Sequence, residues 1–423
     1  MALLVYAFAS VTRRSVTPVS GMWLAGWMMI QLHFTISLFR FATGIWGVLV
    51  STIMVGSLVW AGVLFQSAML PYRQRASSLW MRGTLIATNT LYLALLFADG
   101  VPDWALNLSA ALIGLGPLLI FVIDHRNFNH LLRRVTVLLS GSLSIFILFL
   151  QHSHGNGDLA LNALLFSIYA GCCIDFWYSF NRPTAGAVVT ITGFFLWANV
   201  FSVAPIMARF LPHLHVESEV WNLPKYLVAV GMILLVLEDQ IEHNKYLALH
   251  DELTGLANRR LFQDRLTTAL ERSRRNGTQT ALLVVDLDRF KEVNDTLGHH
   301  AGDLLLQDVG KALVGRVRRT DTVARTGGDE FSLILEPSSR ADAEGVGASL
   351  LQLLQRPMDV DTHSVKVGAS LGIALFPDDA PDEEQLQIAA DLRMYKHKKK
   401  TRNLLHQNAL PPTGEEEEKL RLV

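Results

Sequence analysis

The chain has 423 residues, 50% of them hydrophobic, and its 37 lysines and arginines nearly balance its 38 aspartates and glutamates. This length allows roughly two or three domains, and the balanced charge argues against nucleic acid as a partner. The two cysteines, Cys172 and Cys173, are adjacent within an apolar stretch, so they provide no disulfide framework.

Hydropathy changes abruptly near residue 240. Before this point long apolar stretches alternate with short polar loops, and after it charged residues recur every few positions. We therefore predict an integral membrane domain over residues 1–240, surrounded by membrane lipid. A helical linker over 241–250, a water-soluble domain over 251–407 and a disordered acidic tail over 408–423 are expected to follow.

Eight apolar stretches approach the roughly 20 residues that a helix needs to cross a bilayer. They are residues 21–38, 44–66, 79–98, 105–124, 134–151, 159–179, 184–206 and 223–240. Arginines lie in or beside alternate connections: Arg73, Arg75, Arg82, Arg126, Arg133, Arg134 and Arg182. The positive-inside rule then predicts about eight crossings with both termini in the cytoplasm, and Arg40, Arg209 and Lys225 are the exceptions.

Two predicted outer loops each carry a pair of histidines, His152 with His154 and His213 with His215. Residues two apart in an extended segment face the same side, so each pair can present two imidazoles to one metal ion. The alternative is that these histidines are simply solvated at the membrane interface.

The last apolar stretch continues without proline or glycine from Met232 to Thr254. Its a/d spacing is formed by Leu234, Leu237 and Ile241 and is continued by Asn244 and Ala248. This spacing predicts a helix that leaves the membrane and pairs with the same helix of a second copy. A solvated linker helix is the alternative, because two heptads are a short pattern.

The soluble half carries two acidic pairs at predicted strand ends. An apolar strand over 281–286 ends at Asp286 and Asp288, and the hairpin turn of RTGGDEF carries Asp329 and Glu330. Two helical patterns separate them, which predicts a crossover that places strand and hairpin side by side in one sheet. Converging carboxylates favour Mg²⁺ or Mn²⁺. The alternative is a surface hairpin with solvated acids.

Five long motifs follow one another in the soluble half: DELTGLANRR, DLDRFKEVNDTLGHHAGDLLL, RTGGDEF, SLGIALFP and ADLRMYKHKKKTRN. Together they resemble the GGDEF family of diguanylate cyclases, from Asp251 to Asn403. The resemblance implies a palm-like α/β fold of the nucleotidyl-cyclase type with a central, mostly antiparallel sheet. It also implies a homodimeric enzyme of the bacterial inner membrane, with its GGDEF domain in the cytoplasm, that condenses two GTP into cyclic di-GMP and two pyrophosphates.

The resemblance assigns roles to individual residues. The implied metal ligands are Asp286, the main-chain carbonyl of Leu287, Asp329 and Glu330, and Asp329 is also the implied acceptor of the proton from the attacking 3′-hydroxyl. The implied substrate contacts are Phe290, Lys291, Asn294, His299, Asp303, Lys398 and Arg402. The signature is completed by Gly327, Gly328 and Phe331, and Arg318 with Asp321 resembles an inhibitory RxxD site for the product.

Simple chemistry supports the substrate roles. Guanine offers N–H donors and a carbonyl acceptor, which the amide of Asn294 and the carboxylate of Asp303 complement. Backbone N–H groups at Phe290–Lys291 can receive phosphate oxygens. Taken alone, Asn294, His299 and Asp303 are also compatible with helix caps.

Four positions depart from the family pattern: Thr326, Arg393, His397 and Thr401. The last three lie in the closing helix, where they would affect affinity for the triphosphate. We expect a cyclase regulated by its membrane domain, with no phosphodiesterase domain after the tail. The alternatives are a catalytically silent GGDEF-type receptor for GTP or cyclic di-GMP, and a transporter with a regulatory appendage.

Overall fold

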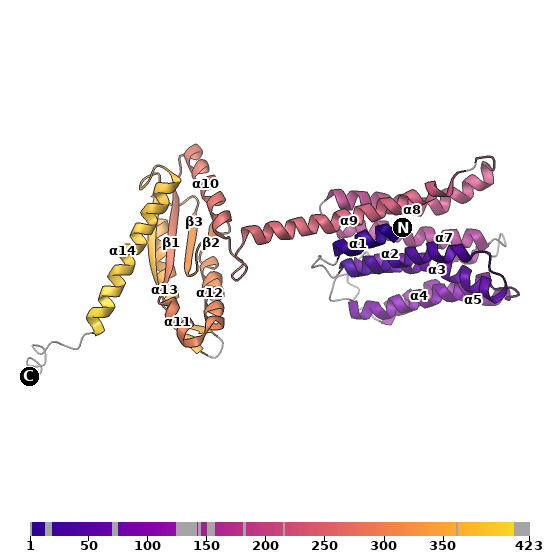
Figure 1. Ribbon diagram of the computed structural model, residues 1–423, viewed down its shortest axis with the longest axis horizontal. Helices are drawn as coiled ribbons and strands as arrows, with labels where there is room; N and C mark the ends of the chain where they lie inside the picture. The colour runs from indigo at the N-terminus through magenta and orange to yellow at the C-terminus, as the bar shows by residue number, and fades with distance from the viewer. Residues whose placement is uncertain are drawn as a thin grey trace, which may run out of the picture. The chain divides into compact units, whose positions relative to one another are not determined.

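The computed structural model describes residues 2–12, 19–69, 75–123, 142, 145–149, 157–180, 183–214, 216–360 and 363–409. The chain divides into two compact units, Met1–Glu242 and His243–Val423, which we call unit 1 and unit 2. Each unit is described by itself (Figure 1).

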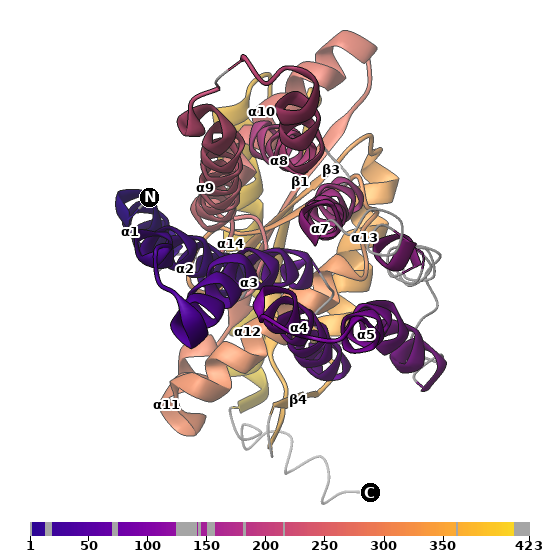
Figure 2. The same ribbon diagram turned by 90° about the vertical axis from the view of Figure 1, so that its right-hand side faces the viewer.

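The described residues of unit 1 form helices and the connections between them, and no strands. Its elements are α1 (Ala2–Thr12), α2 (Val19–Ile36), η1 (Ser37–Phe39), α3 (Gly44–Ala68), α4 (Arg75–Phe97), α5 (Asp103–Ile123), α7 (Gly157–Ser179), α8 (Ala185–Phe210) and α9 (Ser218–Leu249), the last of which continues into unit 2. Figure 2 looks roughly along these helices, which therefore run nearly parallel or antiparallel to one another. Within the bundle α2 packs against α3, α3 against α4 and α7 against α8.

Five helices in the described part of unit 1 are long and apolar enough to cross a membrane. They are Gly21–Phe39, Gly44–Ala68, Gly157–Ser179, Ala185–Phe210 and Glu219–Leu249. This result confirms the prediction of a multi-span helical domain. Helices α4 and α5 cover the predicted spans 79–98 and 105–124, whereas most of the predicted span 134–151 lies outside the described residues.

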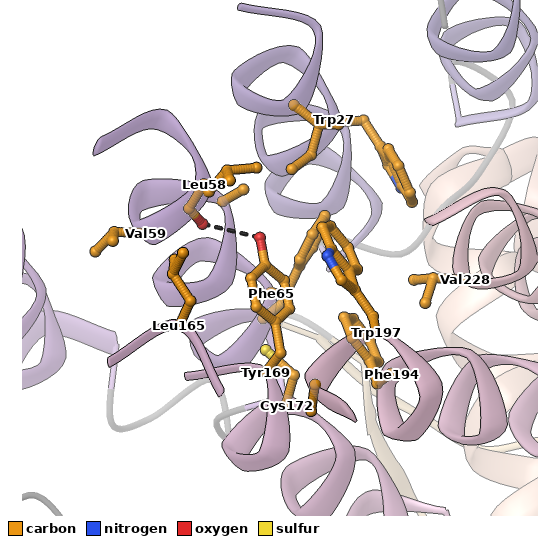
Figure 3. Packing of buried hydrophobic residues seen from close by; sticks show 14 of the residues in the cluster. Trp27, Leu58, Val59, Phe65, Leu165, Tyr169, Cys172, Phe194, Trp197 and Val228 are labelled. Carbon is orange, nitrogen blue, oxygen red and sulfur yellow. Dashed lines mark hydrogen bonds between the residues drawn. The ribbon is translucent and has the colours of Figure 1, made fainter. Parts of the chain in front are cut away.

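The core of unit 1 is rich in aromatic side chains (Figure 3). Tyr169 of α7 stacks on Trp197 of α8 with ring centroids 4.0 Å apart. The polar tips are satisfied locally, because Tyr169 Oη donates to Leu58 O at 2.9 Å and Trp27 Nε1 lies 3.3 Å from the Met232 sulfur. Since no water is present in a bilayer core, such internal hydrogen bonds are the available partners for buried polar groups.

Helices α8 and α9 touch backbone to backbone. A Cβ atom added to Gly193 would lie 2.8 Å from Val228 N, and one added to Gly231 would lie 2.5 Å from Thr190 N. At the start of α8, Gly186 N donates to Glu238 Oε1 of α9 at 3.0 Å. Glycine permits this close approach, and the Glu238 carboxylate binds a helix N-terminus whose N–H groups lack intrahelical partners.

Most residues of the predicted a/d face of α9 are exposed, although the first of them, Leu234, is half-buried. Leu237 is 38% and Ile241 is 53% exposed, whereas Leu235 and Val236 are buried. Asn244 and Ala248, which continue the spacing, are exposed as well. The a/d residues from Leu237 onward are therefore uncovered, as are all the residues from Ile241 to Ala248.

Unit 2 combines a four-stranded sheet with helices on both faces. Its elements are α10 (Arg259–Asn276), β1 (Thr280–Asp288), α11 (Phe290–Leu297), α12 (His299–Val314), β2 (Thr322–Arg325), β3 (Glu330–Leu335), α13 (Arg340–Leu354), β4 (Met358–Val360), β5 (His363–Val365), β6 (Gly368–Phe376) and α14 (Glu383–Ala409). The strand order is β2-β3-β1-β6, and a separate pair is formed by β4 and β5. Figure 1 shows α14 as the long yellow helix beside the sheet.

The predicted hairpin and its neighbour strand are both confirmed. β2 pairs with β3 antiparallel, and β1 pairs antiparallel with β3 on one side and β6 on the other. The strand TALLVVDLD is apolar without alternation because both of its faces are covered. Leu283 and Val285 pack with residues of α12 and α13, whereas Leu282 and Val284 pack with residues of α10 and α14.

Local signals set the ends of the helices in unit 2. Asn258 caps α10 by accepting hydrogen bonds from Arg260 N and Leu261 N, and Gly277 ends this helix with φ of 64°. Ser339 and Asp342 form a capping box at the start of α13. These caps fix the lengths of the helices that cover the sheet.

Candidate active site

Three carboxylates gather at the tips of β1 and β3. Asp286 of β1 lies directly opposite Glu330, the first residue of β3, and Leu287 N donates to Asp329 O at 3.1 Å. Asp286 is only 6% exposed, Asp329 is half-buried and Glu330 is exposed. The antiparallel pairing thus brings together the two acidic pairs that are far apart in sequence.

The glycines of RTGGDEF shape the turn that carries these acids. Thr326 N and Gly327 N both donate to Glu330 O, at 3.0 and 3.3 Å. A Cβ atom on Gly327 would lie 2.7 Å from Glu330 Oε2, so a larger residue there would displace the carboxylate. Phe331, which follows, is fully buried and anchors the turn to the core.

Arg325 ties this turn to the start of unit 2. Its Nε and Nη2 donate to Gly328 O at 3.2 and 2.8 Å, and its Nη1 donates to both carboxylate oxygens of Asp251 at 3.0 and 3.2 Å. Asp251 also accepts hydrogen bonds from Thr254 N and Oγ1. Burial acts to raise the pKa of Asp251, but the hydrogen bonds from Thr254 and Arg325 lower it overall. The sequence analysis did not predict this contact. The only sign of it in the sequence is that Asp251 and Arg325 each begin one of the motifs.

Lys398 of α14 supplies a positive charge to the carboxylates. Its Nζ donates to Asp286 Oδ1 at 2.5 Å. Burial raises the pKa of Asp286, against the lowering effect of Lys398, and the charges of Asp329 and Asp288 raise it further. Burial also raises the pKa of Glu330, together with the charges of Asp286 and Asp329. The cluster therefore has more negative charge than its lysine neutralises.

The carboxylate oxygens of this cluster are suitable ligands for a divalent cation. Asp288, two residues beyond Asp286, accepts from Ser370 Oγ with one oxygen, and its buried Oδ2 has no partner in the described structure. Among the described residues no three or more His, Cys, Asp or Glu side chains are already arranged to hold an ion. Crowded carboxylate oxygens without a complete cage suit Mg²⁺, which binds proteins through one or two carboxylates and keeps waters or phosphates as its other ligands.

The residues around this site match a known protein family. Residues 248–404 match the family described as "Diguanylate cyclase, GGDEF domain". The chain contains a GGDEF domain. This result confirms the resemblance found in the motifs and, with the antiparallel sheet, the predicted fold class.

Two relatives that match this part of the chain come from Pseudomonas aeruginosa. The bifunctional diguanylate cyclase/cyclic di-GMP phosphodiesterase MucR is 40% identical over 191 residues, which are 42% of this chain and 28% of MucR. The diguanylate cyclase TpbB is 40% identical over 168 residues, 39% of each chain. A solved structure of the TpbB GGDEF domain is 41% identical, with a TM-score of 0.35, and the match covers 36% of this chain and 89% of that one. The chain thus spans well under half of either full-length relative.

The predicted substrate residues of the GGDEF domain lie on α11, α12 and α14. Arg289, with φ of 60°, leads into α11, which begins at Phe290 and Lys291. The Asn294 side chain packs directly on Gly302 of α12, beside the exposed Asp303. His299, the first residue of α12, is exposed. The side chain of Arg402 lies outside the described part of α14, so of the two predicted phosphate cations only Lys398 is placed.

The RxxD residues of the GGDEF domain lie together before β2. Arg318 N donates to Asp321 Oδ2 at 2.8 Å, and Asp321 Oδ1 accepts from Glu336 N at 3.3 Å. The Arg318 side chain is exposed. Asp321 is therefore held by two backbone groups, while the guanidinium of Arg318 is accessible to a ligand.

The departures in α14 have different surroundings. Arg393 makes two hydrogen bonds to Asp379 and one to Ile373 O, so its side chain serves the fold of the GGDEF domain. Thr401 Oγ1 donates to His397 O one turn earlier in the same helix.

The outer-loop histidines of unit 1 stay a prediction. His152, His154 and His215 lie outside the described residues, and His213 is exposed. No described contact links His213 to a second metal-binding side chain.

Proposed function

We propose that the chain is a membrane-bound diguanylate cyclase that condenses two GTP into cyclic di-GMP and two pyrophosphates. The pairing of Asp286 with Glu330, next to Asp329 in an undamaged signature, is the observation that carries this proposal. In this proposal residues 1–240 form a sensor of about eight spans, 241–250 a signalling linker, 251–407 the catalytic domain and 408–423 an acidic tail. The bacterial inner membrane holds the protein, with the GGDEF domain in the cytoplasm.

Each residue of the site has a separate role in the proposed reaction. The 3′-oxygen of one GTP forms a bond to the α-phosphorus of the other, the bond from that phosphorus to the bridging oxygen breaks, and pyrophosphate leaves. The same step at the second 3′-hydroxyl and the other α-phosphorus closes the ring and releases the second pyrophosphate. Asp329 accepts the proton of the 3′-hydroxyl. Held by Asp286, the Leu287 carbonyl, Asp329 and Glu330, a Mg²⁺ or Mn²⁺ ion would stabilise the negative charge that develops. Lys398 and Arg402 would bind the triphosphate.

Residues of α11 and α12 select the nucleotide in this proposal. Asn294 and Asp303 come from packed neighbouring helices, which supports a joint contact to the guanine edge. Backbone N–H groups at Phe290 and Lys291, which begin α11, would receive phosphate oxygens, and His299 would lie near the ribose.

Catalysis in this proposal requires two copies of the chain, because one domain holds one GTP. The uncovered a/d face of α9, with Leu237 and Ile241 exposed, supports pairing with the same helix of a second copy. A signal in unit 1 then needs only to change how often two catalytic faces meet, which is a shift in population. Product binding at Arg318 and Asp321 would lower activity by disfavouring that encounter.

The proposal is tested by incubating the purified protein in lipid nanodiscs with GTP and Mg²⁺, alongside Asp329→Ala. We expect cyclic di-GMP and pyrophosphate from the wild type, none from the variant, and none from the wild type after chelation of the metal. A wild type that is dimeric and metal-loaded but forms no product would instead identify a silent receptor for GTP or cyclic di-GMP.

Replacing Arg325 by lysine is expected to lower kcat about tenfold, because an ammonium cannot bind Asp251 and Gly328 O together as the guanidinium does. Initial rates at saturating GTP measure the effect, with Arg265→Lys on the exposed face of α10 as the matched control. A rate within twofold of wild type would show that the turn holds its shape without this contact.

A further inference from the structure

Lys225 is a buried cation in unit 1 that the proposed chemistry does not use. It lies on α9 within a candidate membrane span and is 8% exposed. None of the ion pairs in the described part of the chain involves it. A buried, unpaired charge is costly, and in membrane proteins such groups mark ligand or ion sites.

The surroundings of Lys225 leave hydrogen-bond donors unused. Its Nζ donates to Asn222 Oδ1 at 2.7 Å, which engages one of the three ammonium hydrogens. Two aromatic faces flank the same nitrogen, with the Phe34 centroid at 5.1 Å and the Trp197 centroid at 5.8 Å. Trp197 Nε1 is itself buried without a hydrogen-bond partner in the described structure. Lys225 and Trp197 therefore both have N–H donors without a described acceptor.

The position of Lys225 in the bundle gives the site an orientation. Phe34 is two residues from the end of α2 and Lys225 is seven residues from the start of α9, whereas Trp197 is in the middle of α8. The site therefore lies inside unit 1, in the half that contains the C-terminal end of α2. The predicted topology makes this the outer end. The other two exceptions to the positive-inside rule belong to the same end, because Arg40 follows α2 and Arg209 is in the last turn of α8.

We propose that Lys225 is the counter-charge of an anion site between α2, α8 and α9, and that the site takes a phosphate group. The two remaining ammonium hydrogens suit the several oxygens of phosphate, and the indole N–H of Trp197, the residue whose ring the ammonium faces, is a further donor without a partner. The phosphate belongs either to a free ligand or to a lipid headgroup. Since α9 continues into unit 2, occupancy of this site acts on the helix that joins the two units.

Thermal unfolding of the full chain in nanodiscs tests the site without reference to catalysis. One arm adds inorganic phosphate to phosphatidylcholine nanodiscs, and the other replaces about a third of that lipid with phosphatidylglycerol. We expect a rise in Tm of about 3 °C or more in one arm, because a ligand that binds only the folded state stabilises it. A response to phosphate indicates a free ligand, and a response only to phosphatidylglycerol indicates a headgroup.

Variants assign the response to Lys225. Lys225→Gln is expected to lose at least about tenfold in apparent affinity, Lys225→Arg to keep the response, and Arg40→Gln, at the exposed residue that follows η1, to keep it as the control. The proposal is overturned if the wild type responds in neither arm, or if Lys225→Gln responds as the wild type does.

Discussion

Replacing Asp286 by asparagine is expected to lower the rate of cyclic di-GMP formation at least about 10³-fold. Asparagine has nearly the same shape but removes the negative charge at the one buried carboxylate of the cluster. It also leaves Lys398 without its partner, so the ammonium would compete with a divalent cation for the remaining acids. Product formation at saturating GTP and Mg²⁺, followed by chromatography, measures the effect.

The matched control for Asp286→Asn is Asp308→Asn, which removes a carboxylate from the surface of α12, where it pairs with Lys311. That variant is expected to keep full activity, since surface ion pairs contribute little. Activity of Asp286→Asn within tenfold of the wild type, with both variants folded, would remove Asp286 from the metal-binding set and leave the proposed site without its deepest ligand.

Replacing Asp379 by asparagine is expected to destabilise unit 2 by about 2 kcal/mol. The Asp379 side chain is 12% exposed and joins three elements. It binds Arg340 of α13, Arg393 of α14 and the backbone N–H of Leu375 in β6. The two guanidinium groups are 43% and 41% exposed, so solvent screens part of the loss. Hydrogen exchange of the β6 and α14 amides in the full chain measures it, and unchanged protection would contradict the role.

The same carboxylate predicts a pH dependence. Hydrogen bonds from Arg393, opposed by burial and aided by Arg340, hold the pKa of Asp379 well below its ordinary value. A depressed pKa adds stability above the unfolded pKa of about 3.9, and that stability is lost as the pH falls further. The difference in protection between wild type and Asp379→Asn is therefore expected to be constant from pH 7 to about 5 and to shrink below about 4. A difference that persists unchanged at about pH 3 would mean that Asp379 acts through its shape alone.

The strands and helices of the site could be predicted from the sequence more fully than the contacts between their side chains. The Gly-Gly pair between β-prone runs predicts the β2–β3 hairpin, and the length of the intervening helices predicts its neighbour β1. The register that sets Asp286 opposite Glu330 follows only once both strands are packed between two cores. Hydropathy likewise predicts the helices of unit 1, because length and apolar composition are local properties.

Contacts between residues far apart in the chain could not be predicted, because they leave no pattern in the sequence. Arg325 and Asp251 are 74 positions apart, and their pairing depends on how the hairpin meets the start of the unit. Arg393 appeared from its position to crowd the triphosphate, but Asp379 and Ile373 O hold its side chain in another role. In both cases tertiary packing selected one partner among many that the sequence allows.

The glycine contact between α8 and α9 limits how far these two helices can move relative to each other. With Gly193 and Gly231 in the interface, the two backbones approach closely, and the side chains of Val228 and Thr190 pack directly against the two glycines. Twisting α9 alone would drive Val228 and Thr190 into the opposing main chain. The two helices are therefore expected to move together. A larger side chain at position 231 would force α8 and α9 apart.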